Sequence, residues 1–203
     1  MLTSGVCVSR PPTRRRLDPD ARRAELLDAA DRVLRKNPEA RVEDIVAAAR
    51  AAKGTFYVYF ESWSDLIKAL RERVLAQFYK RYPIVFPKRK QDWWALFDRL
   101  SAGFIDFTLE MEGLHQAVFH TPMAEPPGEE AVQTIALLLQ SGAAAGAFAT
   151  TDAAPLARLI FAMLHETVDA IEAGADRKRA MKALHDLLHR ALAPDERSHR
   201  PRA

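Results

Sequence analysis

Residues 41–66 read RVEDIVAAARAAKGTFYVYFESWSDL and decide the fold of the first part of the chain. A short helix is predicted where apolar residues repeat at helical spacing, at Val42, Ile45, Val46 and Ala49. A second short helix is predicted from Ala52 to Phe60, after a tight connection. Small Ala residues stand where the two helices would touch. The pattern is typical of a helix-turn-helix, whose second helix enters the major groove of DNA.

The second helix of this motif has the chemistry of a DNA-contacting surface on one face. Lys53 supplies a cation near the helix start, and Thr55 and Tyr57 supply hydroxyl groups for phosphates or base edges. Gly54 removes a side chain, so the backbone could come close to DNA. Phe56 and Phe60 are expected on the buried face.

Helices are also predicted on both sides of the motif. Asp18 and Pro19 form a helix start, with an acceptor at the N-cap and Pro at the first helical position. That helix carries a buried stripe and stops at Asn37 and Pro38. Ser62 and Asp65 form a capping-box pair that opens a long helix, which ends before Pro83.

The distal part is predicted to be helical as well, since no strand alternation appears anywhere. A linker at Ile84–Lys90 precedes apolar helical patterns, which cover residues 93–111, 114–119, 131–139, 156–171 and 181–192. Gly174 is expected to end the next-to-last helix and Asp176 to cap the last. Both apolar stripes are wide, so this pair could contact the core on one side and a partner subunit on the other.

Charge is distributed unevenly although the net charge is only +3. Residues 1–90 carry 20 Lys and Arg against 11 Asp and Glu, whereas residues 91–203 carry 10 against 16. A basic first part suits a polyanionic partner, because phosphate contacts by Lys and Arg release condensed counterions. The residues before Leu17 include Arg14, Arg15 and Arg16 and are expected to form a flexible basic arm, which either lies along phosphates or is a solvated tail.

Cys7 is the single cysteine, so an intrachain disulfide or a cysteine metal cluster is excluded. Neither a signal peptide nor a membrane span is apparent, and the cytoplasm is the expected location.

The motif resembles that of the tetracycline-repressor (TetR) family of one-component regulators. The resemblance covers roughly Asp20 to Leu70 and depends on Asp44, Ile45 and Ala48, on the run from Lys53 to Phe60, and on Ser62 to Leu66. It implies an all-α fold of about nine helices. An N-terminal three-helix DNA-binding domain would be followed by a larger helical ligand-binding and dimerisation domain.

The resemblance also implies how such a protein works. It would be a homodimer closed by its last two helices, which binds a palindromic operator in double-stranded DNA and releases it when a small-molecule effector enters the distal domain. The domains would be a basic arm at 1–17, a DNA-binding domain at 18–65, an effector-binding and dimerisation domain at 66–193 and a polar tail at 194–203. The predicted DNA-binding residues are Arg41, Val42, Ala52, Lys53, Thr55, Tyr57 and Tyr59.

Three positions differ from the family pattern. Val42 stands where many members have a capping Thr. Arg50 occupies a turn position usually held by Gly, where a left-handed conformation would cost ~1 kcal/mol or more. Trp63 replaces a residue that is usually basic and phosphate-binding, so operator affinity or preference is expected to differ.

An apolar effector cavity with a few polar groups is predicted in the distal part, against the alternative of a packed core with satisfied histidines. The candidate lining residues are Trp94, Phe97, Phe104, Phe119, His120, Phe161 and His165. His115 and Glu166 lie in the same segments.

Metal binding and catalysis find little support in the sequence. His185 and His189 share a helical face, but the Glu of a zinc-peptidase helix and a third ligand are not evident, so surface or dimer-face histidines are preferred. Neither a catalytic triad nor a phosphate-binding glycine loop can be assembled. No cofactor is expected.

Two other functions stay open. The chain could be a helical enzyme or carrier for an apolar small molecule with a structural N-terminal domain, or a helical scaffold. A DNA-binding regulator differs from both in its salt-sensitive, sequence-specific binding.

Overall fold

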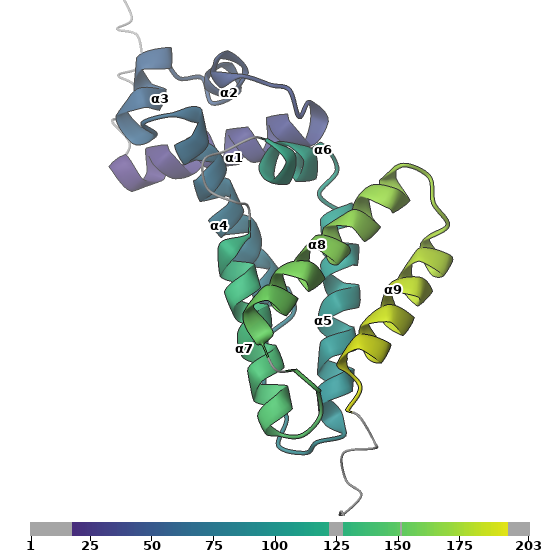
Figure 1. Cartoon of the computed structure of the whole chain (residues 1–203). Coiled ribbons are helices and arrows are strands. Elements are labelled where there is room, and N and C mark those ends of the chain that lie inside the picture. The colour runs from purple at the N-terminus through teal and green to yellow at the C-terminus, as the bar shows by residue number, and fades with distance from the viewer. Residues whose placement is uncertain (1–17, 122–127, 151, 195–203) are drawn as a thin grey trace, which may run out of the picture.

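The computed structural model describes residues 18–121, 128–150 and 152–194 (Figure 1). Within these residues it contains helices, turns and loops and no strand, which confirms the all-α prediction. The elements are α1 (Pro19–Lys36), α2 (Val42–Ala48), α3 (Lys53–Tyr59), α4 (Trp63–Arg81), α5 (Asp92–Leu109), α6 (Gly113–His115), the π-helical turn η1 (Gln116–His120), α7 (Glu129–Ala144), α8 (Ala153–Glu172) and α9 (Arg177–Leu192). The predicted basic arm and, apart from residue 194, the predicted tail lie outside the described residues.

The helix starts follow the sequence signals, with two differences in detail. Asp18 is the N-cap of α1, but its side chain makes no capping hydrogen bond, so Pro19 carries that signal. At α4 the Ser62 hydroxyl accepts from the N–H of Asp65 at 3.2 Å, whereas the Asp65 carboxylate accepts from Glu61 and not from Ser62. Only one of the two hydrogen bonds of the predicted capping box is therefore formed, because the Asp65 carboxylate binds the N–H of the residue before the N-cap.

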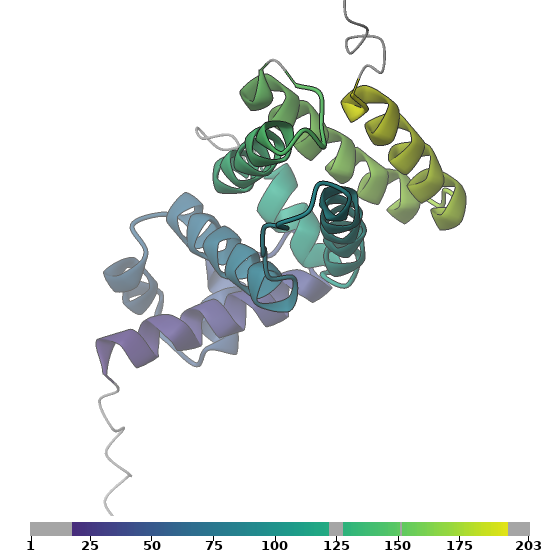
Figure 2. The same cartoon turned by 90° about the horizontal axis from the view of Figure 1, so that it is seen from below.

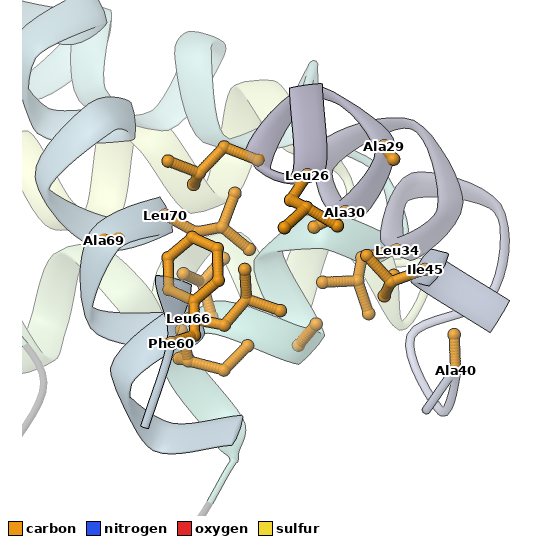
Figure 3. Close-up of a cluster of buried hydrophobic side chains, with 14 of the residues drawn as sticks. Leu26, Ala29, Ala30, Leu34, Ala40, Ile45, Phe60, Leu66, Ala69 and Leu70 are labelled. Atoms are coloured by element: carbon orange, nitrogen blue, oxygen red, sulfur yellow. The ribbon is translucent and has the colours of Figure 1, made fainter. Parts of the chain in front are cut away.

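A first hydrophobic core joins α1, α2, α3 and the first turns of α4 (Figure 3). Leu26, Ala30 and Leu34 of α1 point toward Ile45 of α2 and toward a group that includes Phe60, Leu66 and Leu70. These side chains are almost completely buried. Burying a Leu or Phe side chain contributes about 1.5–3 kcal/mol, so this shared core holds the short helices at fixed angles.

A second core fills the distal bundle. It is formed by the end of α4 with α5, α7, α8 and α9. Helix α8 packs against α5, α7 and α9, and α8 and α9 lie side by side at the edge of the molecule (Figures 1 and 2). Figure 2 shows this pair on the side away from α1, α2 and α3.

The two cores meet along α4, and α6 packs closely against α1. A Cβ atom at Gly113 would lie 2.8 Å from the carbonyl oxygens of Leu34 and Arg35, so only glycine allows this approach. The Arg35 guanidinium donates to the Glu110 carbonyl at 3.1 Å across the same contact. Leu114 and Val118 then extend the first core.

None of the helices in the described residues is long and apolar enough to span a membrane.

Candidate functional site

The turn between α2 and α3 is a left-handed helix end built around Arg50. Arg50 has φ +50°, its N–H donates to Ala47 at 3.1 Å, and the N–H of Ala51 donates to Val46 at 2.8 Å. These two bonds form a Schellman motif, which normally has glycine at the position of Arg50. The expected left-handed conformation is therefore present, with an exposed arginine in it.

Helix α3 presents one face to solvent and buries the other. Phe56 on α3 and Phe60 just after it are fully buried, as predicted, whereas Tyr57 is 52% and Val58 is 75% exposed. Lys53 and Gly54 are exposed on the same side. The exposed face of α3 is therefore formed by Lys53, Gly54, Tyr57 and Val58.

Val58 was missing from the sequence-based set, because an apolar residue within a core-forming run is usually assigned to the interior. Only the structure shows that the Val58 side chain is exposed. On a DNA-contacting helix a valine can pack against a thymine methyl group.

The cation on this face is paired in the unbound protein. The Lys53 ammonium donates to the Glu43 carboxylate of α2 at 2.5 Å, and both side chains are exposed. This hydrogen bond raises the pKa of Lys53 and lowers the pKa of Glu43. A phosphate contact by Lys53 would therefore have to replace this ion pair with Glu43.

Three predicted DNA-binding side chains are less accessible than expected. Val42 is 9% exposed and its side chain packs in the first core. Arg41, not residue 42, is the N-cap of α2, and its N–H donates to the Asp44 carboxylate at 2.8 Å. Thr55 and Tyr59 are half-buried, and Tyr59 packs against the core.

Trp63 is also half-buried against the first core. It begins α4, so packing replaces the phosphate contact that the position usually makes. Ala52, the N-cap of α3, and Arg41 are exposed, as a DNA-facing position requires.

Residues 26–70 match the sequence model described as bacterial regulatory proteins of the tetR family. Over these residues the chain is similar to the N-terminal domain of that family. The match covers the end of α1, the whole helix-turn-helix and the start of α4. No curated protein sequence matches the chain significantly.

Several solved structures match 88–91% of the chain. RolR in complex with resorcinol is 18% identical, with 91% of this chain and 96% of that chain covered and a TM-score of 0.65. A TetR-family transcriptional regulator from Pectobacterium atrosepticum is 21% identical, with coverages of 88% and 97% and a TM-score of 0.63. A candidate transcriptional regulator from Saccharomonospora viridis in complex with choline is 18% identical, with coverages of 88% and 100% and a TM-score of 0.60. At these identities the matches show a shared fold.

The distal bundle contains a cavity of about 370 Å³ between α4, α5, α7 and α8. Its wall is mainly apolar and includes Phe97, Phe104, Phe119 and Phe161 from the predicted set. Tyr79, Ser101 and Thr134 add polar groups, and burial raises the pKa of Tyr79. The cavity can therefore hold a small apolar molecule and orient it by a few hydrogen bonds.

The other three residues predicted to line a cavity are not among the residues that line this one. The Trp94 ring stacks on His189, with 4.0 Å between ring centroids, at the contact of α5 with α9. The His165 ring lies beside the rings of Phe161 and Phe119, at 4.4 and 4.5 Å, and does not reach the cavity wall. His120 lies 3.2 Å from Asp169 of α8.

Beside His185 and His189 the structure places a third, acidic side chain that the sequence does not reveal. Asp98 of α5 lies 3.4 Å from His185 and 2.8 Å from His189. The residue is 91 positions away from His189, so helical spacing within α9 could not reveal it.

Proposed function

We propose that the chain is a sequence-specific DNA-binding transcriptional repressor, which a small, mainly apolar effector releases from a palindromic operator. The observation that carries the proposal is the orientation of α3. Its two phenylalanines anchor it in the core, and its opposite face leaves Lys53, Tyr57 and Val58 in solvent. A short helix held in this way can enter a major groove without unfolding.

The proposed contacts divide into two kinds. Lys53 and the exposed Arg41 would neutralise phosphates and position the helix, whereas Tyr57 and Val58 would reach base edges. Ala52 and Gly54 allow close approach, and Thr55 would offer its hydroxyl from the edge of the face. Arg50 adds a cation at the turn.

We propose that a homodimer brings two α3 helices to one side of the duplex. Leu159 of α8 is 61% exposed and Leu187 of α9 is 53% exposed, which is unusual for leucines on two adjacent helices. Pairing α8 and α9 with their copies would bury both in a four-helix bundle. The two reading helices would then be about 34–36 Å apart, one turn of B-DNA.

The effector would bind in the cavity between α4, α5, α7 and α8. Helix α4 lines that cavity and also carries Leu66 and Leu70 of the first core, so a ligand that displaces α4 would move the helix-turn-helix. The resorcinol complex of RolR, which shares this fold, shows a small aromatic ligand in one such protein. Because the proposed target is bacterial DNA, we also propose that the protein acts in the cytoplasm.

DNA binding is tested with the full-length chain and DNA from a random pool, together with the DNA that flanks its own gene. Fluorescence anisotropy should show salt-sensitive binding to a short palindrome. Lys53→Ala and Tyr57→Ala should weaken specific binding by about 1–3 kcal/mol each without changing the helical circular-dichroism spectrum. Lys88→Ala, an exposed cation in the α4–α5 connection, is the matched control. Unchanged affinity in both α3 variants would overturn the assignment of α3.

A carrier or enzyme is the second candidate, because the cavity alone would suit either. Such a protein would retard DNA only weakly and without sequence preference. Mass spectrometry of the denatured, freshly purified protein identifies a retained ligand, and adding that ligand to the DNA complex decides between the two. Release of the operator supports the repressor, and a ligand with no effect on DNA affinity supports the carrier.

A further inference from the structure

A cluster of histidines and carboxylates lies apart from the cavity, between η1 and α8. His115 Nδ1 is 3.6 Å from Glu172 Oε2 and 3.8 Å from Asp169 Oδ1, and His120 Nε2 is 3.2 Å from the same Asp169 oxygen. One ligand atom from each of His115, His120 and Asp169 lies within 4.8 Å of the others. The turn of η1 contributes to this geometry, since i→i+5 hydrogen bonding brings residues five apart to one side.

The buried atoms of this cluster lack hydrogen-bond partners. His115 is 0% exposed, and neither its Nδ1 nor Asp169 Oδ1 makes a hydrogen bond. The contacts at 3.6 and 3.8 Å are too long to be hydrogen bonds. A buried nitrogen that faces two carboxylates without a hydrogen bond to either is an unfavourable arrangement, and a cation bound between these groups would satisfy them.

The other ring nitrogen of His115 has a histidine as its neighbour. His115 Nε2 is 3.2 Å from His165 Nδ1. When Nε2–H of His115 donates to His165, the lone pair of His115 lies on Nδ1 and points at the carboxylates. Metal-binding histidines are commonly held in this way by a second residue.

We propose that His115, His120, Asp169 and Glu172 form a binding site for a divalent transition metal ion of the Zn²⁺ class. Two imidazole nitrogens and two carboxylate oxygens suit Zn²⁺, whereas Mg²⁺ and Ca²⁺ prefer oxygen ligands alone. Zn–N and Zn–O bonds of about 2.0–2.2 Å in a tetrahedron place the ligand atoms roughly 3.3–3.6 Å apart. Asp169 Oδ1 lies 3.2 Å from His120 Nε2 and 3.8 Å from His115 Nδ1, close to these values. Glu172 Oε2 lies 3.6 Å from His115 Nδ1 but outside the group of ligand atoms that are within 4.8 Å of one another, so its carboxylate has to rotate toward the ion to complete the site.

The site is open on one side, so an ion can enter. The side chains of His120, Asp169 and Glu172 are 40%, 29% and 28% exposed. The second histidine cluster, Asp98 with His185 and His189, has no comparable buried, unpartnered atom, because His189 already shares a hydrogen bond with Asp98 at 2.8 Å. This second cluster therefore serves as the negative control for metal binding.

The test measures metal binding by the chelator-treated full-length protein, with Zn²⁺ and Co²⁺ as the only probes. We expect one equivalent of Zn²⁺ per chain in competition with a chromophoric chelator, a rise in melting temperature, and the visible absorption of four-coordinate Co²⁺. His120→Ala and Glu172→Gln change exposed groups and should leave the fold intact by circular dichroism. Each should weaken Zn²⁺ binding at least roughly tenfold.

The double variant His185→Ala/His189→Ala is the matched control and should bind like the unchanged protein. Failure of the unchanged protein to bind Zn²⁺ would overturn the proposal. So would binding that survives in His120→Ala and Glu172→Gln but disappears in the control variant. None of these outcomes depends on DNA binding.

Discussion

At the scale of single residues, two exposed cations of the helix-turn-helix, Lys53 and Arg50, influence how strongly this surface can bind DNA. Lys53 is held by Glu43, so part of any phosphate contact replaces an existing ion pair. Arg50 places a cation at the turn but in a backbone conformation that favours glycine. Both features are visible only once the α2–α3 geometry is known.

Replacing Glu43 by Gln should strengthen DNA binding. The change frees Lys53 and removes a negative charge from the DNA-facing surface, so affinity should rise about two- to fivefold at low salt, with a smaller gain at high salt. Anisotropy titrations over a range of salt concentrations measure this. Glu39→Gln makes the same charge change at another exposed position and should have a smaller effect. Equal effects of the two variants would mean that only net charge matters.

Replacing Arg50 by Gly should stabilise the fold and weaken DNA binding. Glycine relieves the cost of the left-handed conformation, so the free energy of unfolding should be about 1 kcal/mol higher for Arg50→Gly than for Arg50→Ala. Both variants lose the arginine charge, but only Arg50→Ala keeps the backbone strain. Chemical denaturation compares the two variants. If Arg50→Ala is at least as stable as Arg50→Gly, the backbone strain argued for this turn is wrong.

At the scale of elements, glycine decides how closely α6 approaches α1. The same substitution at two helical glycines should therefore change stability in opposite directions. Gly113→Ala places a methyl group 2.8 Å from two carbonyl oxygens and should cost about 1–3 kcal/mol. Gly54→Ala meets no atom within 4 Å and should gain about 0.5–1 kcal/mol from helix propensity. Thermal and chemical unfolding of both variants measure this, and a stabilised Gly113→Ala would refute the close packing.

At the scale of the whole molecule, assembly and DNA recognition are expected to depend on one another through α8 and α9. Leu187→Glu should prevent the proposed dimer, because a carboxylate would have to be buried between subunits. Leu137 of α7 has the same exposure, 53%, so Leu137→Glu is the matched control. Sedimentation velocity should show a monomer only for Leu187→Glu, together with loss of operator binding. A dimeric Leu187→Glu would require another interface.

The sequence by itself determined the local structure of this protein. Helical spacing of apolar residues, the Pro19 start, the Ser62 cap and the Gly174 end depend on neighbours within a few residues, so the helices and the helix-turn-helix could be predicted without any tertiary contact. The burial of Phe56 and Phe60 followed from the same periodicity.

Only the tertiary structure decided which distant side chains meet. Trp94, His120 and His165 are residue types that commonly line cavities, but the packing of α5, η1 and α8 places their side chains outside the lining of this one. Val58 is exposed and Val42 is buried although their side chains are identical, because the packing of α2 and α3 determines which face each residue occupies. The approach of Asp169 to His115 and of Asp98 to His189 joins segments more than 50 residues apart. Helical periodicity contains no information about such contacts, since they depend on how whole helices pack.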